Sequence, residues 1–238
     1  MTLAKIWGLK ALSKPYEQAC IDWAEQLLIA GNTSENVLIL ASLGLDQKPE
    51  YYDVERYFLL ALQDLKVTEP DYFESIKCYG IYLCNQALTG ELGLEKAANL
   101  LAEIYPSTNY DYDIFSIWTD LLDDLYLLEN EDPYFDHPEL TKTNQQAYIE
   151  KQIRHFAVLL SRDVPPDFMN RGLCHECQTL VKMEWRKKTR ITGFQKVMQV
   201  FKLQKPVYCT ECLTCGSTNI TRLLTVEARE QALRILQK

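Results

Sequence analysis

Five of the eight cysteines lie in two short runs near the C-terminus, and their spacing is that of metal ligands. The first run is Cys174-His-Glu-Cys177, and the second is Cys209-Thr-Glu-Cys212-Leu-Thr-Cys215. Two Cys-x-x-Cys turns separated by a strand-forming segment can place four thiolates around one ion, as in tetrahedral zinc sites. The sequence therefore predicts a Zn2+ site made by Cys174, Cys177, Cys212 and Cys215.

A fifth cysteine leaves the choice of the second pair open. Cys209 and Cys212 also have Cys-x-x-Cys spacing, so Cys209 is an alternative ligand. The pair Cys212 and Cys215 is favoured because Gly216 follows it, and glycine readily takes the positive φ needed after such a turn. His175 could replace one thiolate, although a side chain inside such a turn usually points away from the ion. Four thiolates close the coordination shell, which predicts a structural rather than a catalytic zinc.

The second cysteine run resembles one knuckle of the zinc-ribbon family. Members of that family often read Cys-x-x-Cys-Gly-Ser-x-Asn followed by a β-branched residue, and residues 212–220 here read Cys-Leu-Thr-Cys-Gly-Ser-Thr-Asn-Ile. The resemblance covers about residues 173–224 and implies a small β-fold held by structural zinc. This chain departs from the family pattern in Cys209 and in the long spacer of residues 178–211. The resemblance does not imply what the ribbon binds.

The part of the chain before the cysteine runs is predicted to be helical. Apolar residues recur at helical spacing in seven stretches, residues 13–31, 35–43, 50–65, 70–90, 94–105, 114–128 and 143–160. Ser13 and Ser34 are expected to cap the first two helices. Short connections favour antiparallel neighbours, as in a multi-helix bundle or an irregular α-solenoid, and no pattern repeats at a fixed period of about 34–40 residues.

The pattern changes after the pair Pro165-Pro166, where a helix rarely continues. Strands are expected at residues 178–185, 206–208 and 220–224, followed by a terminal helix that Thr225 can cap. We therefore expect a mainly α fold with two domains, an acidic α-helical domain of residues 1–163 and a small C-terminal β zinc-ribbon domain of residues 164–238 that ends in a helix.

Charge divides at the same place. Residues 1–164 carry 12 Lys and Arg against 27 Asp and Glu, a balance of −15, whereas residues 165–238 carry 13 against 6, a balance of +7. Such a split suggests different electrostatic partners for the two halves, although the halves can also attract each other.

The basic residues concentrate in the spacer between the cysteine runs, where aromatic residues are interleaved. Cations neutralise phosphates and exposed rings stack on bases, so the segment 182–205 is a candidate nucleic-acid-binding element. A solvated hairpin facing the acidic helices explains the composition equally well. The residues we single out are Lys182, Arg186, Lys187, Lys188, Arg190 and Lys196.

Acidic and tyrosine residues concentrate in the opposite half, between the fifth and seventh predicted helices. Such a surface suits a basic protein partner, by electrostatic steering and charge pairing, although solvated helix faces are the commoner explanation. The candidate partner-binding residues are Tyr110, Asp113, Asp120, Asp123 and Asp124.

Motifs of the common enzyme classes are missing from the sequence. There is no Gly-x-Gly-x-x-Gly, no Walker Gly-Lys-Ser/Thr, no His-Glu-x-x-His and no Gly-x-Ser-x-Gly. The three histidines stand apart, and Cys20, Cys78 and Cys84 are expected to be small buried apolar residues on helices. We therefore expect a protein that is not an enzyme.

Localisation follows from two further features. The first ten residues lack the apolar segment of a signal peptide, and no stretch reaches the ~18 apolar residues of a membrane span. A cytoplasmic protein with no membrane partner is expected, and in that compartment thiols are free or metal-bound rather than oxidised.

The N-terminal helices also resemble short bacterial proteins that carry a Trp-Ala-x-x-Leu-Leu element followed by a Ser-x-x-Leu-x-x-Leu-Ala helix. The matching residues are Trp23-Ala24, Leu27-Leu28 and the stretch 34–43. Their compact acidic character is similar to that of immunity proteins, which neutralise basic toxins. The leading hypothesis is thus a protein-binding module with a structural zinc ribbon, in its most concrete form a bacterial immunity-type protein. The alternatives are a nucleic-acid-associated zinc-ribbon factor and an enzyme with its site in the helical domain.

Overall fold

The computed structural model describes residues 2–46, 48–130, 137, 139–165, 167–183, 186–187 and 208–236. Within these residues the chain is mainly helical, as predicted. Nine α-helices lie in the described part, and their bounds are α1 Leu3–Ala11, α2 Glu17–Ile29, α3 Glu35–Ser42, α4 Tyr51–Asp64, α5 Tyr72–Leu88, α6 Leu94–Ser107, α7 Ser116–Glu129, α8 Gln145–Leu160 and α10 Val226–Leu236. None of these helices is long and apolar enough to span a lipid bilayer.

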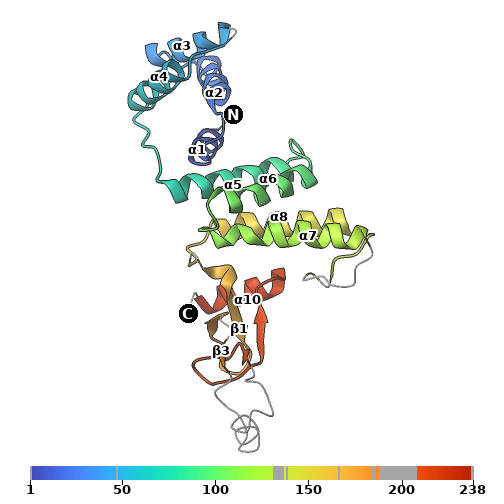
Figure 1. The fold of residues 1–238 in the computed structure, drawn as a ribbon. Coiled ribbons are helices and arrows are strands. Elements are labelled where there is room, and N and C mark those ends of the chain that lie inside the picture. Colours follow the sequence, from blue (N-terminus) through green and yellow to red (C-terminus); the bar gives the residue numbers. More distant parts are fainter. Residues whose placement is uncertain are drawn as a thin grey trace, which may run out of the picture.

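The helices stack in successive layers along one direction, which fits an irregular α-solenoid better than a closed bundle (Figure 1). Helices α1–α4 form one end, α5 and α6 the next layer, and α7 and α8 the layer after that. Helices α1 and α5 approach each other very closely: a Cβ atom on Gly8 would lie 2.2 Å from Cβ of Tyr79. Only glycine allows this approach of the two helices.

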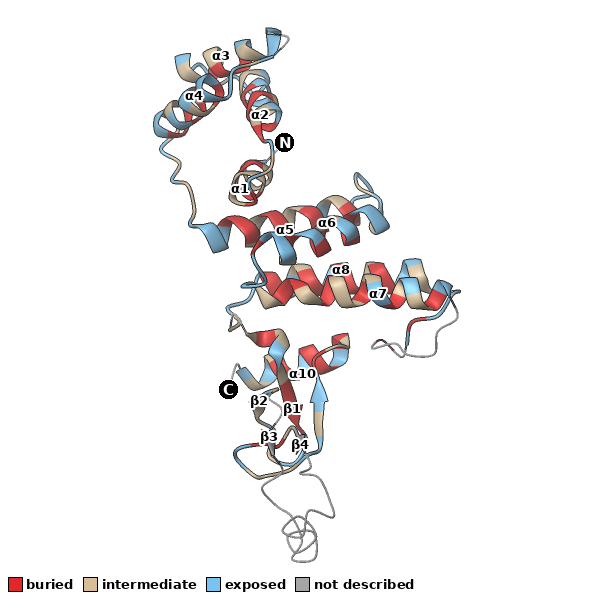
Figure 2. Ribbon diagram, viewed as in Figure 1, coloured by how far each residue is buried: buried red, intermediate tan, exposed pale blue. Residues whose placement is uncertain are grey.

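Two clusters of buried apolar residues support this stack, and Figure 2 shows buried residues on the inner face of each layer. One cluster packs helices α1, α2, α3 and α4 together around Trp23 and Phe58, whose rings meet edge to face with centroids 5.5 Å apart. The other joins α5 to α8 around Trp118 and Phe156, with ring centroids 5.3 Å apart.

Local sequence signals placed most helix ends correctly. Ser34 accepts a hydrogen bond from the backbone N–H of Val37, and Thr225 accepts one from that of Ala228. The prediction that Ser13 caps a helix was wrong: Ser13 has a φ of +53° and follows α1, a helix that the apolar pattern did not reveal. Helix α2 starts only at Glu17.

The C-terminal region contains two small antiparallel sheets. Strands β1 (Arg171–Cys174), β2 (Leu180–Lys182) and β5 (Ile220–Arg222) form one sheet with β1 in the centre. Strands β3 (Arg186–Lys187) and β4 (Tyr208–Cys209) form the other. Strand β1 was not predicted, because its four residues carry no alternation long enough to recognise.

The C-terminal region packs directly on the helices. Phe168, Leu173, Leu223, Ala228 and Ala232 belong to the same apolar core as α5–α8. Residues on both sides of the predicted boundary at 163 and 164 therefore share one core. The division of the chain into two domains stays a prediction.

Candidate metal centre

The two predicted cysteine turns have the same backbone geometry. In the first, the N–H of Gln178 donates to the carbonyl oxygen of Cys174 at 3.0 Å, and the N–H of Cys174 donates to that of Thr179 at 3.0 Å. Both bonds recur at the corresponding positions of the second turn, from Gly216 to Cys212 and from Cys212 to Ser217. Residues 174–179 thus correspond to residues 212–217, and Cys177 corresponds to Cys215. This match supports Cys215 rather than Cys209 as the partner of Cys212.

A left-handed residue ends each turn. Gly216 has a φ of +71°, as its glycine predicted, and Gln178 occupies the matching position with a φ of +54°. This conformation costs a side-chain-bearing residue about 1 kcal/mol relative to glycine. The residue type of Gln178 does not indicate a positive φ. The signal in the sequence is its position directly after a Cys-x-x-Cys pair.

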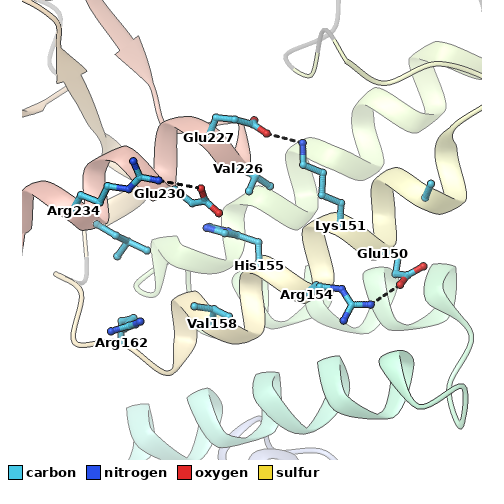
Figure 3. A pocket seen from close by; sticks show the side chains of 12 residues that line it. Glu150, Lys151, Arg154, His155, Val158, Arg162, Val226, Glu227, Glu230 and Arg234 are labelled. Atoms are coloured by element: carbon cyan, nitrogen blue, oxygen red, sulfur yellow. Dashed lines mark hydrogen bonds and ion pairs between the residues drawn. The ribbon is translucent and has the colours of Figure 1, made fainter.

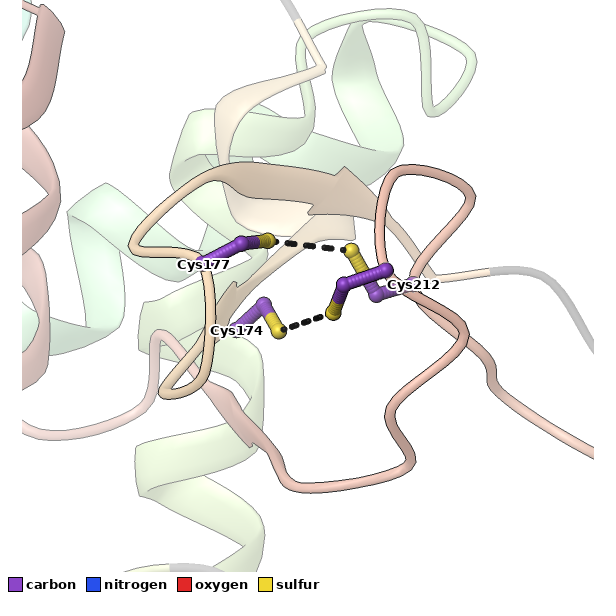
Figure 4. Close-up of side chains that lie close together, drawn as sticks. Cys174, Cys177 and Cys212 are labelled. Carbon is purple, nitrogen blue, oxygen red and sulfur yellow. Dashed lines mark hydrogen bonds between the residues drawn. The ribbon is translucent and has the colours of Figure 1, made fainter.

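The turns bring the four predicted ligands together at the end of the β1–β2–β5 sheet (Figure 4). The Sγ atoms of Cys174, Cys177, Cys212 and Cys215 all lie within 4.8 Å of one another. Across the turns, the Sγ atoms of Cys174 and Cys215 are 3.6 Å apart, and those of Cys177 and Cys212 are 3.4 Å apart. A tetrahedron with Zn–S bonds of ~2.3 Å requires sulfur separations of about 3.8 Å. The cluster could therefore hold a metal ion, and zinc fits its donors.

The thiols influence one another's ionisation. Burial raises the pKa of Cys212, but hydrogen bonds from the backbone of Cys215 and Thr214 outweigh it and bring the pKa to about 6. The Ser217 backbone lowers the pKa of Cys215, yet burial and the neighbouring sulfurs raise it to about 12. One thiolate is thus stabilised by the turn, whereas four adjacent thiolates require a cation to balance their charge.

The other candidate ligands differ in position. His175 points out of the first turn, and its Nε2 lies 2.6 Å from Oγ1 of Thr221 on β5, so it does not join the sulfurs. The backbone of Cys209 lies in β4, and its side chain is outside what the structure describes. Cys20 and Cys84 are buried in the helical cores, as expected, and burial raises the pKa of Cys84 to about 12.

A buried arginine joins the C-terminal region to the helices. Arg229 of α10 is fully buried and donates from Nη1 to the carbonyl oxygens of Leu223 and Leu224, at 3.2 and 2.7 Å. Its Nη2 donates to Oε1 of Gln152 on α8, and its Nε donates to Nδ1 of His155 at 3.4 Å. Arg229 was not predicted to be buried. Its helical spacing from the apolar residues Val226 and Ala232 places it on the buried face of α10, and that spacing could have indicated its burial.

Half of the six candidate nucleic-acid-binding residues lie in described strands. Lys182 is exposed at the end of β2, and the backbones of Arg186 and Lys187 form β3. Lys188, Arg190 and Lys196 lie outside the described residues. The binding of nucleic acid by this segment stays a prediction.

The five candidate partner-binding residues do not form one exposed surface. Tyr110 is 63% exposed, and Asp123 is exposed on α7. Asp113 instead accepts hydrogen bonds from the hydroxyl of Tyr105, at 3.1 Å, and from the amide of Asn170, linking the segment before α7 to the segment before β1.

Asp124 must be removed from the candidate surface. It is only 4% exposed, and its Oδ2 accepts from the backbone N–H of His137 at 2.7 Å and lies 2.7 Å from the Nδ1 of that ring. Helical periodicity turns Asp123 outward and its neighbour Asp124 inward. The carboxyl group of Asp124 thus serves to hold His137 in the core.

Comparisons with known proteins add no family assignment. No protein-family model matches the chain, and searches of curated proteins and of solved structures gave no significant match. The resemblances to zinc ribbons and to immunity-type proteins therefore rest on the quoted motifs alone.

Proposed function

We propose that this protein is a non-enzymatic protein-binding module whose C-terminal ribbon is held by one structural zinc ion. The proposal is carried by the four sulfur atoms within 4.8 Å of one another, presented by two turns of the same backbone geometry. Four thiolates leave no open coordination position for a substrate, so the metal would serve folding.

The metal proposal is tested by elemental analysis of the purified protein. We expect one zinc per chain, lost in Cys177→Ser and in Cys215→Ser because each removes one of four ligands. Cys209→Ser and Cys78→Ser are the matched controls and should retain the metal. Loss of zinc in Cys209→Ser with retention in Cys215→Ser would contradict the ligand set.

The partner is proposed to be a basic protein that binds the acidic helices. The surface that supports this consists of Tyr110, Asp120 and Asp123, which we call the acidic patch. Asp120 and Asp123 lie one helical turn apart on α7, and Asp120 and Tyr110 both act electrostatically on Tyr105. An exposed ring beside carboxylates is suited to a cationic partner, since it offers both charge pairing and stacking.

The acidic patch is tested with the charge reversal Asp120→Lys/Asp123→Lys in a pull-down from the native host. A matched control is Asp22→Lys/Glu25→Lys, two acids with the same spacing on α2. We expect a basic protein to be recovered by the wild type and the control, and lost in the α7 variant. Recovery of no partner, or unchanged recovery by the α7 variant, would refute the proposal.

The most concrete version is neutralisation of a basic toxin, as immunity-type proteins do. Co-expression of the wild-type chain with the recovered partner should then restore growth of a host that the partner inhibits. The α7 variant should not restore it, because the neutralising charges are reversed.

A further inference from the structure

A groove runs between α8 and α10, where the last helix of the ribbon region lies against the helical stack (Figure 3). Its volume is about 750 Å³, within the range of about 300–1,000 Å³ typical of small-molecule sites. Neither the metal centre nor the acidic patch contributes a residue to it.

The floor of the groove is aliphatic. Val158 from α8 and Val226 and Leu233 from α10 line it, and Val158 is 46% exposed there. No Phe, Tyr or Trp is found among the described lining residues. A nucleobase would stack on such rings, so this floor suits an aliphatic chain instead.

The charges on the rim are unevenly matched. At one end Lys151 pairs with Glu227 at 2.7 Å. At the other end, Arg234 reaches Glu230 only at 3.8 Å, and Arg162 forms no ion pair with a described residue. Figure 3 shows Arg234, on α10, and Arg162, beyond the end of α8, at the same end of the groove but apart from each other. Neither guanidinium group has a close ion pair with a described residue, which leaves both available to an anion.

An unsatisfied donor lies between the two ends. Nδ1 of His155 accepts from the Nε of Arg229, which can only donate, so in the neutral ring the proton is on Nε2. That Nε2 is buried and has no partner among the described residues, although His155, itself only 8% exposed, lines the groove. A buried N–H without an acceptor leaves this wall of the groove one hydrogen bond short.

We propose that this groove binds a small amphipathic anion, an aliphatic chain with one carboxylate or phosphate head group. The head lies between Arg162 and Arg234, and the chain lies along Val158, Val226 and Leu233. This ligand site is independent of the proposed zinc ion and of the acidic patch.

Isothermal titration calorimetry of the full-length protein tests the site with four probes below their micelle-forming concentrations. Decanoate and decyl phosphate carry both the chain and the head, decanol lacks the charge, and acetate lacks the chain. We expect decanoate or decyl phosphate to bind at least tenfold more tightly than decanol and acetate. A preference for decanoate indicates a fatty-acid-type ligand, and a preference for decyl phosphate indicates a phospholipid-type ligand.

Variants locate the site on the protein. Arg162→Ala/Arg234→Ala should weaken binding of the charged probes roughly tenfold, the factor that 1.4 kcal/mol of lost head-group interaction gives. Val158→Trp should abolish binding because the indole fills the groove. Arg56→Ala, at an exposed arginine on α4, should bind as the wild type does. Absence of binding, equal binding of decanol, or unchanged affinity in Val158→Trp would overturn the proposal.

Discussion

Removal of zinc by a chelator is expected to unfold the two cysteine turns and to leave helices α1 to α8 folded. Each turn contains six residues, 174–179 and 212–217, whose order depends on the sulfur cluster. Fixing twelve residues costs about 12 kcal/mol at ~1 kcal/mol per backbone. Among the described residues, the local core adds Val181 to the buried cysteines, with Ile220 partly buried against them, and burial of Val181 contributes about 2 kcal/mol. The binding of zinc by four thiolates supplies about 10–16 kcal/mol, enough to offset this cost.

Hydrogen exchange measures the effect at individual amides. The N–H groups of Cys174, Gln178, Cys212 and Gly216 donate within the turns and should be protected in the zinc-loaded protein. After chelation they should exchange at the rate of an unstructured peptide, whereas amides of α5 and α8 keep their protection because a large apolar core that contains none of the four cysteines holds them.

Two controls separate metal loss from other effects of the chelator. Cys177→Ser should show the same loss of protection without chelator, and added zinc should restore the wild type but not this variant. Protected turn amides in protein shown by elemental analysis to be metal-free would refute the reasoning.

Three further predictions concern stability in the described residues. Arg229→Met should lower the free energy of unfolding in urea by about 3 kcal/mol, because it leaves buried acceptors on Gln152 and His155 without a donor. The control Arg234→Met, on the exposed face of α10, should change the free energy of unfolding by less than ~0.5 kcal/mol. Burial and the adjacent Arg229 charge lower the pKa of His155 to about 4, below its value of about 6.5 in the unfolded chain. The unfolded chain therefore binds a proton first, and the free energy of unfolding should fall by about 2 kcal/mol between pH 7.5 and pH 5. Urea titrations of His155→Gln should show a correspondingly weaker pH dependence. Gln178→Gly should stabilise the zinc-loaded protein by about 1 kcal/mol and Gly216→Ala should destabilise it by a similar amount, since both positions have positive φ; a thermal denaturation series with opposite signs would contradict this.

The helices were largely predictable because their signals are local. Apolar residues at helical spacing, with caps such as Ser34 and Thr225, report the backbone around themselves and require no knowledge of the remaining chain. Helix α1 was the exception among the helical elements. It is held by the close contact of Gly8 with Tyr79, 71 residues away, and such a contact leaves no mark on the local pattern.

The candidate metal ligands were also determined by the sequence, because Cys-x-x-Cys spacing limits where two thiols can point. The sequence favoured Cys215 over Cys209 because Gly216 follows it, and the equal hydrogen bonding of the two turns and the cluster of four sulfur atoms support that choice. Tertiary structure alone decided which charges are available. Asp123 is exposed whereas Asp124 is buried against His137, and Arg229 is buried whereas Arg234 is exposed beside the groove. Residue type and spacing specify the chemistry a side chain can perform, but the packing of distant helices decides whether solvent or a ligand can reach it.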